Sequence, residues 1–153
     1  VWPKIKKAVS GVKLWIVGTH MGEEIRKLAS VDIEVTEGLE DIRDAYKNAS
    51  VLVAPIKGPG GTRLKILEAM ASALPVVTTS VGAEGLGVCD NHEALIRDNL
   101  DGLSEAAVSI LNNEALAGRL GKSGKDFVEK NYTWDESAQK LDRIYKEVYE
   151  KKP

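Results

Sequence analysis

A glycine-rich segment at residues 55–62 has the composition of a phosphate-binding loop. Its sequence, PIKGPGGT, separates a short apolar run from a helix-like pattern. Glycine lets the backbone approach a ligand closely, and the unpaired amides of a first helical turn, at the positive end of the helix dipole, attract phosphate. We therefore predict a phosphate site where this segment enters the helix. The alternative interpretation is that Gly58, Gly60 and Gly61 only form a tight turn.

The helix-like pattern that follows carries charged residues of the types that bind nucleotides. Lys65 and Glu68 are three residues apart and therefore share one face of a helix. A carboxylate in the second turn can accept hydrogen bonds from both hydroxyls of a ribose, and a lysine can contact a phosphate oxygen. The alternative is a solvent-exposed ion pair between these two residues, which would stabilise the helix only slightly. Leu64, Leu67 and Met70 form the expected core face.

Two other segments offer weaker candidates for ligand contact. Residues 79–87 combine glycines with Glu84 after an apolar run, so this loop either closes over the same ligand or is an ordinary surface loop. His20 also follows an apolar run, but nothing near it in sequence marks it as a catalytic base. His92 has no partner at metal-ligand spacing and is expected on the surface. We therefore predict no metal site.

Several classes of nucleotide-dependent enzyme are disfavoured by the motifs. The pattern G-x-x-x-x-G-K-[ST] of phosphate-loop ATPases does not occur, and no G-x-G-x-x-G follows the first apolar run, as a dinucleotide-binding fold would require. An epimerase would need a catalytic pair of tyrosine and lysine. The tyrosines all fall in helix-like or C-terminal segments, at positions Tyr46, Tyr132, Tyr145 and Tyr149.

Short apolar runs alternate with helical patterns and predict the elements that position these residues. Strands are expected at residues 12–18, 31–35, 51–54, 75–79 and 93–96. Helices are expected at residues 23–29, 41–49, 62–73, 104–111, 114–130 and 134–149, with Thr62 able to cap the third of them. This order predicts an α/β fold with a mostly parallel sheet, helices on both faces and further helices at the C-terminal end. Ligands of such sheets bind at the carboxyl ends of the strands, where the glycine-rich segment lies.

Length and composition indicate one domain of ordinary character. The chain has 153 residues, of which 43% are hydrophobic, enough for one continuous core. A net charge of -2 provides no strong field for nucleic acid or an anionic membrane surface. No stretch approaches the roughly 18 uninterrupted apolar residues of a transmembrane helix. The single cysteine, Cys89, fits a reducing compartment, so we expect a cytoplasmic location.

The motifs together resemble a known family. Residues 53–71, 74–79 and 82–86 resemble the C-terminal domain of the GT-B-fold retaining glycosyltransferases of the glycosyl transferases group 1 family. Residues 14–18, and residues 132–134 with 144–145 in the closing helix, extend the resemblance over nearly the whole chain. It implies two facing Rossmann-like domains, of which the C-terminal one holds a nucleotide-sugar donor and the N-terminal one the acceptor. Residues 1–153 would then form the donor-binding half of such an enzyme.

The resemblance also implies roles for individual residues. Glu68 matches the carboxylate that grips the donor ribose, and Leu39 falls where the base is held. Gly61, Thr62 and Leu64 fall in the segment whose backbone meets the diphosphate. The expected donor site consists of Leu39, Gly60, Gly61, Thr62, Leu64, Lys65 and Glu68, with His20, Arg63 and Glu84 as weaker members. No catalytic residue is assigned within this half, and no cofactor or metal is expected.

The sequence departs from the family pattern at three places. Gly60 stands where many members carry a glutamate eight residues before the ribose-binding one, a trait of subfamilies that have a glycine-rich loop and a lysine at the place of Lys65. Residues 36–38 displace a glycine that usually follows the second strand. The chain also begins after the family's leading strand and its basic, diphosphate-neutralising loop, so we expect a truncated N-terminal edge, weak nucleotide binding and no transfer by this chain alone.

Two further expectations concern partners. In the helix expected at residues 134–149, an apolar stripe is formed by Leu141, Ile144, Tyr145 and Val148. In the family this helix crosses back to the other domain, so part of the stripe is expected to be exposed here, and a weak homodimer would be one way to cover it. The alternative function is a non-catalytic Rossmann-like nucleotide-binding or scaffold module, for which the glutamate missing at Gly60 is the main argument.

Overall fold

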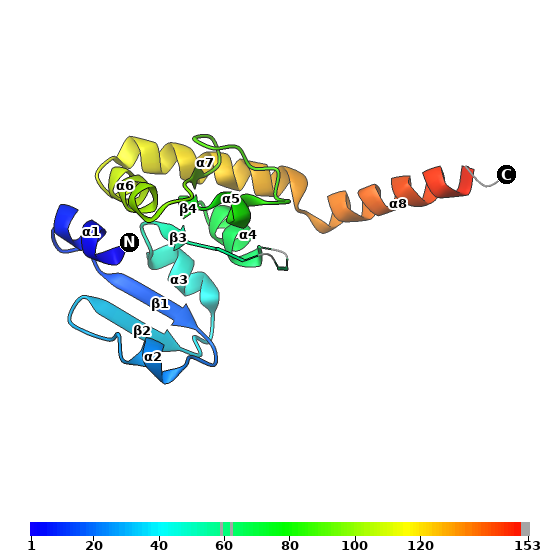
Figure 1. Ribbon diagram of the computed structural model, residues 1–153. Helices are drawn as coiled ribbons and strands as arrows, with labels where there is room; N and C mark the ends of the chain where they lie inside the picture. Colours follow the sequence, from blue (N-terminus) through cyan, green and yellow to red (C-terminus); the bar gives the residue numbers. More distant parts are fainter. Residues whose placement is uncertain (59, 62, 151–153) are drawn as a thin grey trace.

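The protein is an α/β domain in which short parallel strands alternate with helices (Figure 1). The computed structural model describes residues 1–58, 60, 61 and 63–150. Its strands are β1 (Leu14–Gly18), β2 (Ile33–Glu37), β3 (Leu52–Ala54), β4 (Val76–Thr78) and β5 (Leu95–Ile96). Its helices are α1 (Trp2–Ala8), α2 (Glu23–Arg26), α3 (Ile42–Asn48), α4 (Leu64–Ala71), α5 (Ser80–Ala83), α6 (Leu100–Leu111), α7 (Glu114–Asn131) and α8 (Trp134–Glu150).

The order of elements agrees with the sequence, with two additions, α1 and α5. Each expected strand and helix has a counterpart, usually shorter by a few residues at its ends. The four-residue helix α5 lies in the segment expected to be a loop, and Thr79 caps it by accepting a hydrogen bond from the Gly82 amide at 3.0 Å. Thr62, the expected cap of α4, lies outside the described residues; Arg63 occupies the position before this helix.

All strand pairs are parallel, as predicted, but they form two sheets instead of one. Strands β1 and β2 pair with each other, while β4 lies between β3 and β5. Within the described part of the chain, β1 and β3 each have one neighbour, so each leaves one edge unpaired. The predicted parallel α/β fold is therefore confirmed, with its strands divided between two small sheets because no described strand pairs with both β1 and β3.

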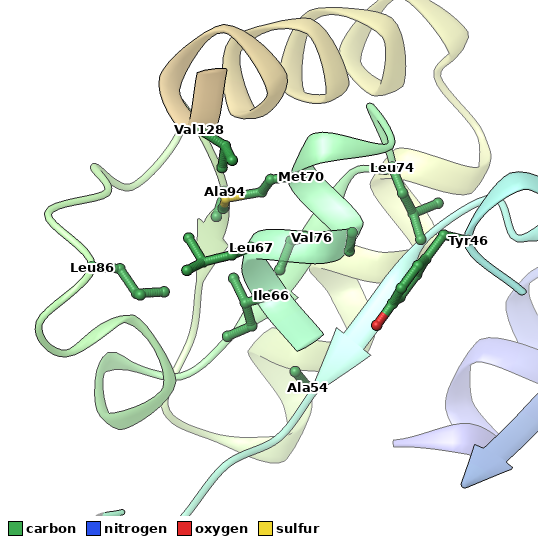
Figure 2. Close-up of a cluster of buried hydrophobic side chains, with 11 residues drawn as sticks. Tyr46, Ala54, Ile66, Leu67, Met70, Leu74, Val76, Leu86, Ala94 and Val128 are labelled. Atoms are coloured by element: carbon green, nitrogen blue, oxygen red, sulfur yellow. The ribbon is translucent and has the colours of Figure 1, made fainter. Parts of the chain in front are cut away.

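The three-stranded sheet is covered on both faces, as expected. Successive residues of β4 point to opposite sides, so Val76 joins one hydrophobic cluster and Val77 the other. The first cluster gathers around α4 and is shown in Figure 2, with Ile66 and Met70 fully buried. The second lies against α1 and α6. This sheet is the rigid base from which α4 and the glycine-rich segment extend.

Helices α4 and α7 pack closely because α7 has glycines at the contact. A Cβ atom added to Gly121 would lie 2.2 Å from the Ala73 carbonyl oxygen, and one added to Gly124 would lie 3.1 Å from Cγ of Met70. The 2.2 Å separation is not tolerated between non-bonded atoms, so this contact requires glycine at position 121, whereas at Gly124 the Met70 side chain would only have to shift slightly. The packing fixes the direction of α4.

Helix α8 extends away from the rest of the molecule (Figure 1). None of its residues is buried, and Trp134 at its start is 91% exposed. The apolar stripe expected from the sequence is indeed exposed, with relative exposures from 51% at Leu141 to 67% at Tyr145. Among the described residues, no helix combines the length and the apolar character that crossing a membrane requires.

Candidate functional site

The glycine-rich segment connects the end of β3 with the start of α4. Gly60 has a φ of 142° and Gly61 a φ of 61°, both in the region that L side chains rarely adopt. A Cβ added at either position would meet nothing within 4 Å, so the backbone conformation and not crowding requires glycine. A glutamate at Gly60, where many family members have one, would therefore strain this loop. The backbone conformation at Gly60 is therefore a physical reason for the absence of a glutamate from this position.

Arg63 joins the glycine-rich segment to the loop after β4. Its guanidinium donates to the carbonyl oxygens of Val81 at 3.0 Å and of Gly60, with a longer contact of 3.4 Å to that of Gly58. A second link is the Thr79 hydroxyl, which donates to the Ile56 carbonyl at 2.5 Å. The two loops predicted to flank one ligand thus lie side by side, and the Arg63 guanidinium is engaged with protein carbonyls.

The face of α4 that points to solvent carries the charged residues singled out in the sequence. Lys65 and Glu68 are both exposed, while Leu67 and Met70 are buried. Leu64 was expected in the core face but is 58% exposed, because the first turn of α4 extends beyond the cluster that covers its later turns. Its predicted backbone role does not depend on that side chain.

Glu68 contacts a tyrosine and not the lysine on its own helix. Its Oε2 atom accepts a hydrogen bond of 2.9 Å from the Tyr46 hydroxyl on α3. None of the ion pairs formed among the described residues joins Lys65 to Glu68. The simple helix salt bridge that was the alternative interpretation therefore does not form. Sequence analysis missed Tyr46 as a member of the site, because its partner lies 22 residues away in sequence.

Leu39 lies in the turn between β2 and α3 and is half-buried. The turn ends at Asp41, whose side chain accepts a 2.9 Å hydrogen bond from the Arg43 amide and caps α3. The Arg43 side chain and amide together lower the pKa of Asp41 to about 2. Helix α3 therefore begins three residues after the predicted base contact, Leu39, and carries Tyr46 to the predicted ribose contact.

The two remaining candidates lie on other loops at the carboxyl ends of strands. His20 is exposed after β1 and has a φ of 54°. Its loop is fastened to the end of β2, where Glu37 accepts hydrogen bonds of 2.9 Å from the Met21 amide and from Nε of Arg26. Glu84 is exposed directly after α5. The predicted residues follow β1 and β2 in one sheet and β3 and β4 in the other, and within each sheet these parallel strands end at the same edge.

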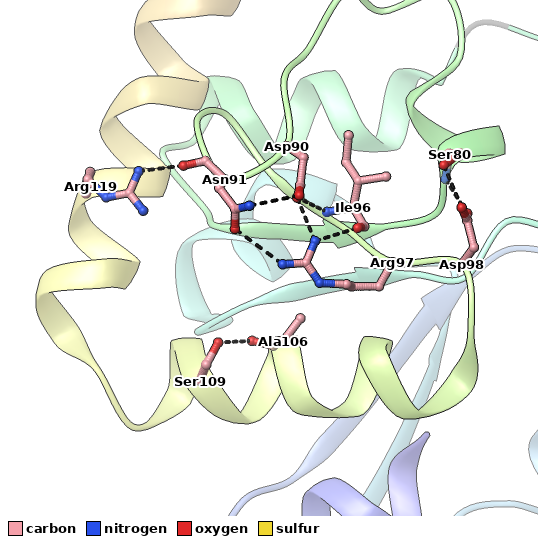
Figure 3. A network of polar contacts seen from close by, with 9 residues as sticks. All are labelled: Ser80, Asp90, Asn91, Ile96, Arg97, Asp98, Ala106, Ser109 and Arg119. Atoms are coloured by element: carbon pink, nitrogen blue, oxygen red, sulfur yellow. Dashed lines mark hydrogen bonds and ion pairs between the residues drawn. The ribbon is translucent and has the colours of Figure 1, made fainter.

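A polar network beyond β5 was not predicted from the sequence (Figure 3). Arg97 pairs with Asp90 at 2.7 Å, and Arg119 donates to the Asn91 carbonyl at 2.8 Å. Asp98 accepts two 2.7 Å hydrogen bonds from the amide and hydroxyl of Ser80, the first residue of α5. A groove of about 960 Å³ lies beside this network and α6, and none of the predicted donor-site residues lines it. The network links the segments on either side of β5 to α5 and to α7.

The histidine and cysteine side chains form no metal centre in the described part of the chain, where no group of three or more potential ligands was found. His92 is 68% exposed, as expected for a surface residue. Its Nδ1 lies 2.6 Å from Oε1 of Glu93, a contact that the sequence spacing did not reveal. Cys89 is exposed and unpaired with any other cysteine.

Comparisons with known proteins agree with the resemblance. A family model described as glycosyl transferases group 1 matches residues 1–113. The chain is 29% identical over 153 residues to a phosphatidyl-myo-inositol mannosyltransferase from Mycobacterium leprae, covering 95% of this chain and 41% of that protein. The chain spans between 34% and 41% of the length of the first curated relatives.

Solved structures show the same fold. A sucrose-phosphate synthase from Thermosynechococcus elongatus superposes with a TM-score of 0.78 at 24% identity, covering 98% of this chain and 42% of that one. TarM from S. aureus, solved in a complex that contains UDP, superposes with a TM-score of 0.77 at 19% identity, covering 93% and 30%. The α/β fold of this chain is therefore that of GT-B glycosyltransferases.

Proposed function

The chain belongs to the glycosyl transferases group 1 family, and we propose that it holds the nucleoside-diphosphate-sugar donor during sugar transfer. The observation that carries the proposal is the position of Glu68. Its carboxylate is exposed on the second turn of α4, is held by Tyr46 and is not consumed by a lysine of the same helix. A carboxylate placed in this way can accept hydrogen bonds from both hydroxyls of a ribose.

The diphosphate of the donor is proposed to bind one turn away. Helix α4 begins three residues after Gly61, and the open surroundings of Gly60 and Gly61 leave room for a ligand beside the backbone. The positive end of the α4 dipole favours the negative charge there, and Lys65 on the Glu68 face supplies a cation. Leu39 is the proposed contact for the base. TarM was solved with UDP, which supports a nucleoside diphosphate as the ligand here.

The rest of the reaction is proposed to need a second domain. The acceptor would bind to an N-terminal domain of a longer protein, because this chain covers less than half of the length of its relatives. Transfer is proposed to retain the configuration of the sugar and to need no metal ion. In isolation the chain would bind nucleotide weakly and complete no transfer, since stabilisation of the leaving diphosphate is the main electrostatic task of the reaction.

Two further parts of the proposal concern location and assembly. A cytoplasmic location is proposed from the single cysteine, and a fluorescent fusion in the source cell would test it. A weak homodimer through the exposed stripe of α8 is proposed as one way to cover that stripe when no other domain does so. Sedimentation of the chain at increasing concentration would contradict this dimer if the mass stayed that of a monomer.

An amide NMR titration with UDP, GDP, ADP and NAD tests the donor site. We expect saturable shifts at residues 60–68 with one nucleoside diphosphate, lost in Glu68→Ala because the ribose contact is removed. The matched control is Glu105→Ala, which removes an exposed glutamate from α6 and should leave the shifts unchanged. Saturable binding that is identical in Glu68→Ala and the parent chain would contradict the proposed site.

The alternative function, a non-catalytic nucleotide-binding or scaffold module, is favoured by one observation. The φ of 142° at Gly60 excludes an unstrained glutamate from the place where many family members contact the sugar. Assays of hydrolysis and sugar transfer by the full-length protein separate the two functions. Their substrate is a nucleotide sugar that carries the base identified in the NMR titration. Sugar transfer would exclude the scaffold module, whereas nucleotide binding without any turnover would favour it.

A further inference from the structure

Tyr46 is the one residue whose side chain holds the Glu68 carboxylate within the described part of the chain. The Tyr46 hydroxyl donates to Oε2 of Glu68 at 2.9 Å, across the interface of α3 and α4. No hydrogen bond or ion pair among the described residues uses Oε1 of Glu68. One oxygen is therefore fixed by the protein, and the other remains available to a ligand.

The Tyr46 ring is itself held rigidly. It is only 9% exposed and belongs to the cluster around α4, where Leu74 and Ile66 are also buried. Figure 2 shows the ring beside β3, with its hydroxyl directed toward the end of the strand at which Ala54 lies. That is the end from which the glycine-rich segment leaves. The hydroxyl is thus anchored by core packing close to where the ligand is proposed to bind.

The hydroxyl is also a permanent donor. Burial raises the pKa of Tyr46, and the adjacent Glu68 carboxylate raises it further. The phenol therefore stays protonated at neutral pH, and its proton points at the carboxylate. An exposed glutamate otherwise samples many rotamers, and immobilising a rotamer-rich side chain on binding costs affinity. A partner that fixes the carboxylate beforehand removes part of this cost.

We propose that Tyr46 is a positioning residue that presents the Glu68 carboxylate to the vicinal hydroxyls of a ribose. This inference rests on the proposed donor-binding function and adds a residue to it. Helix α3 starts at Ile42, three residues after Leu39, so one short helix connects the proposed base contact to the proposed ribose contact. A nucleoside with both ribose hydroxyls is the ligand that this arrangement favours.

The test compares Tyr46→Phe with Tyr132→Phe in the full-length protein. Tyr132 is a matched control, because its hydroxyl also donates at 2.9 Å, to the Leu86 carbonyl, and burial raises its pKa too. Affinities are measured by calorimetry for the nucleoside diphosphate that binds and for its 2′,3′-dideoxy analogue. Loss of one hydrogen bond predicts that Tyr46→Phe binds the ribose form roughly two- to tenfold more weakly. Tyr132→Phe should bind it as the parent protein does.

The dideoxy analogue separates positioning from a general loss of structure. It lacks the hydroxyls from which Glu68 would accept hydrogen bonds, so Tyr46→Phe should bind it as tightly as the parent protein does. In a Glu68→Ala background, Tyr46→Phe should have no further effect on the ribose form. Equal losses for both ligands, or unchanged affinity in Tyr46→Phe, would overturn the role of Tyr46 alone. Unchanged affinity in Glu68→Ala would overturn the proposed donor site as well.

Discussion

The two sheets differ in how completely they are packed. Every residue of β4 in the three-stranded sheet is buried, with helices on both faces, whereas every residue of β1 in the two-stranded sheet is only half-buried. The three-stranded sheet carries Glu68, Lys65 and the glycine-rich segment, whereas His20 and Leu39 follow strands of the two-stranded sheet. The difference indicates that the phosphate and ribose part of the proposed site has a rigid support, while the base part depends on a less completely packed one.

A large effect is expected where α7 packs closely on α4. In Gly121→Ala the new Cβ would lie 2.2 Å from the Ala73 carbonyl oxygen, so the helices must separate. Overpacking of this kind costs about 1–3 kcal/mol or more of the free energy of unfolding. The control is Gly118→Ala on the same helix, where a Cβ meets nothing within 4 Å and should stabilise by roughly 0.5–1 kcal/mol. Urea unfolding measures both, and a stable Gly121→Ala variant would contradict the packing.

A pair of truncations compares the sheets directly, and the larger of its two effects is at least as great. Met70→Ala removes a fully buried side chain from the cluster around α4 and should cost about 2–5 kcal/mol. Ile16→Ala truncates a half-buried residue of β1 and should cost roughly 1 kcal/mol, because less apolar area leaves water there. Thermal unfolding measures the two changes. Equal losses would show that the two-stranded sheet is packed as tightly as the other.

The smallest effect concerns the cap of α3, on the less packed side. The folded pKa of Asp41 is about 2, below its ordinary value of 3.8, so its contribution to stability is complete above about pH 4 and is lost as the pH falls toward 2. Asp41→Ala should therefore lower the melting temperature at pH 6, with the difference from the parent chain closing near pH 2. Asp44→Ala is the control on the same helix. A difference that grew on acidification would contradict this cap.

Several features could be predicted from the sequence because local patterns encode them. Short apolar runs and alternating patterns located the strands, and helical spacing located α6 and α7 to within a few residues. Glycine is required at Gly60 and Gly61 by backbone conformation, which is a local property. Leu64 was placed in the wrong environment, because spacing identifies a helix face but not where the rest of the molecule stops covering it.

The sequence by itself determined the parallel α/β architecture, the segment that enters α4 and the exposed carboxylate of Glu68, since each depends on residues close together in the chain. Tertiary structure alone decided that the strands divide into two sheets and that Arg63 joins two loops. It also decided that Tyr46 holds Glu68 across 22 residues of sequence. These contacts depend on how helices pack against a sheet, and no periodicity or motif records which side chains that packing brings together.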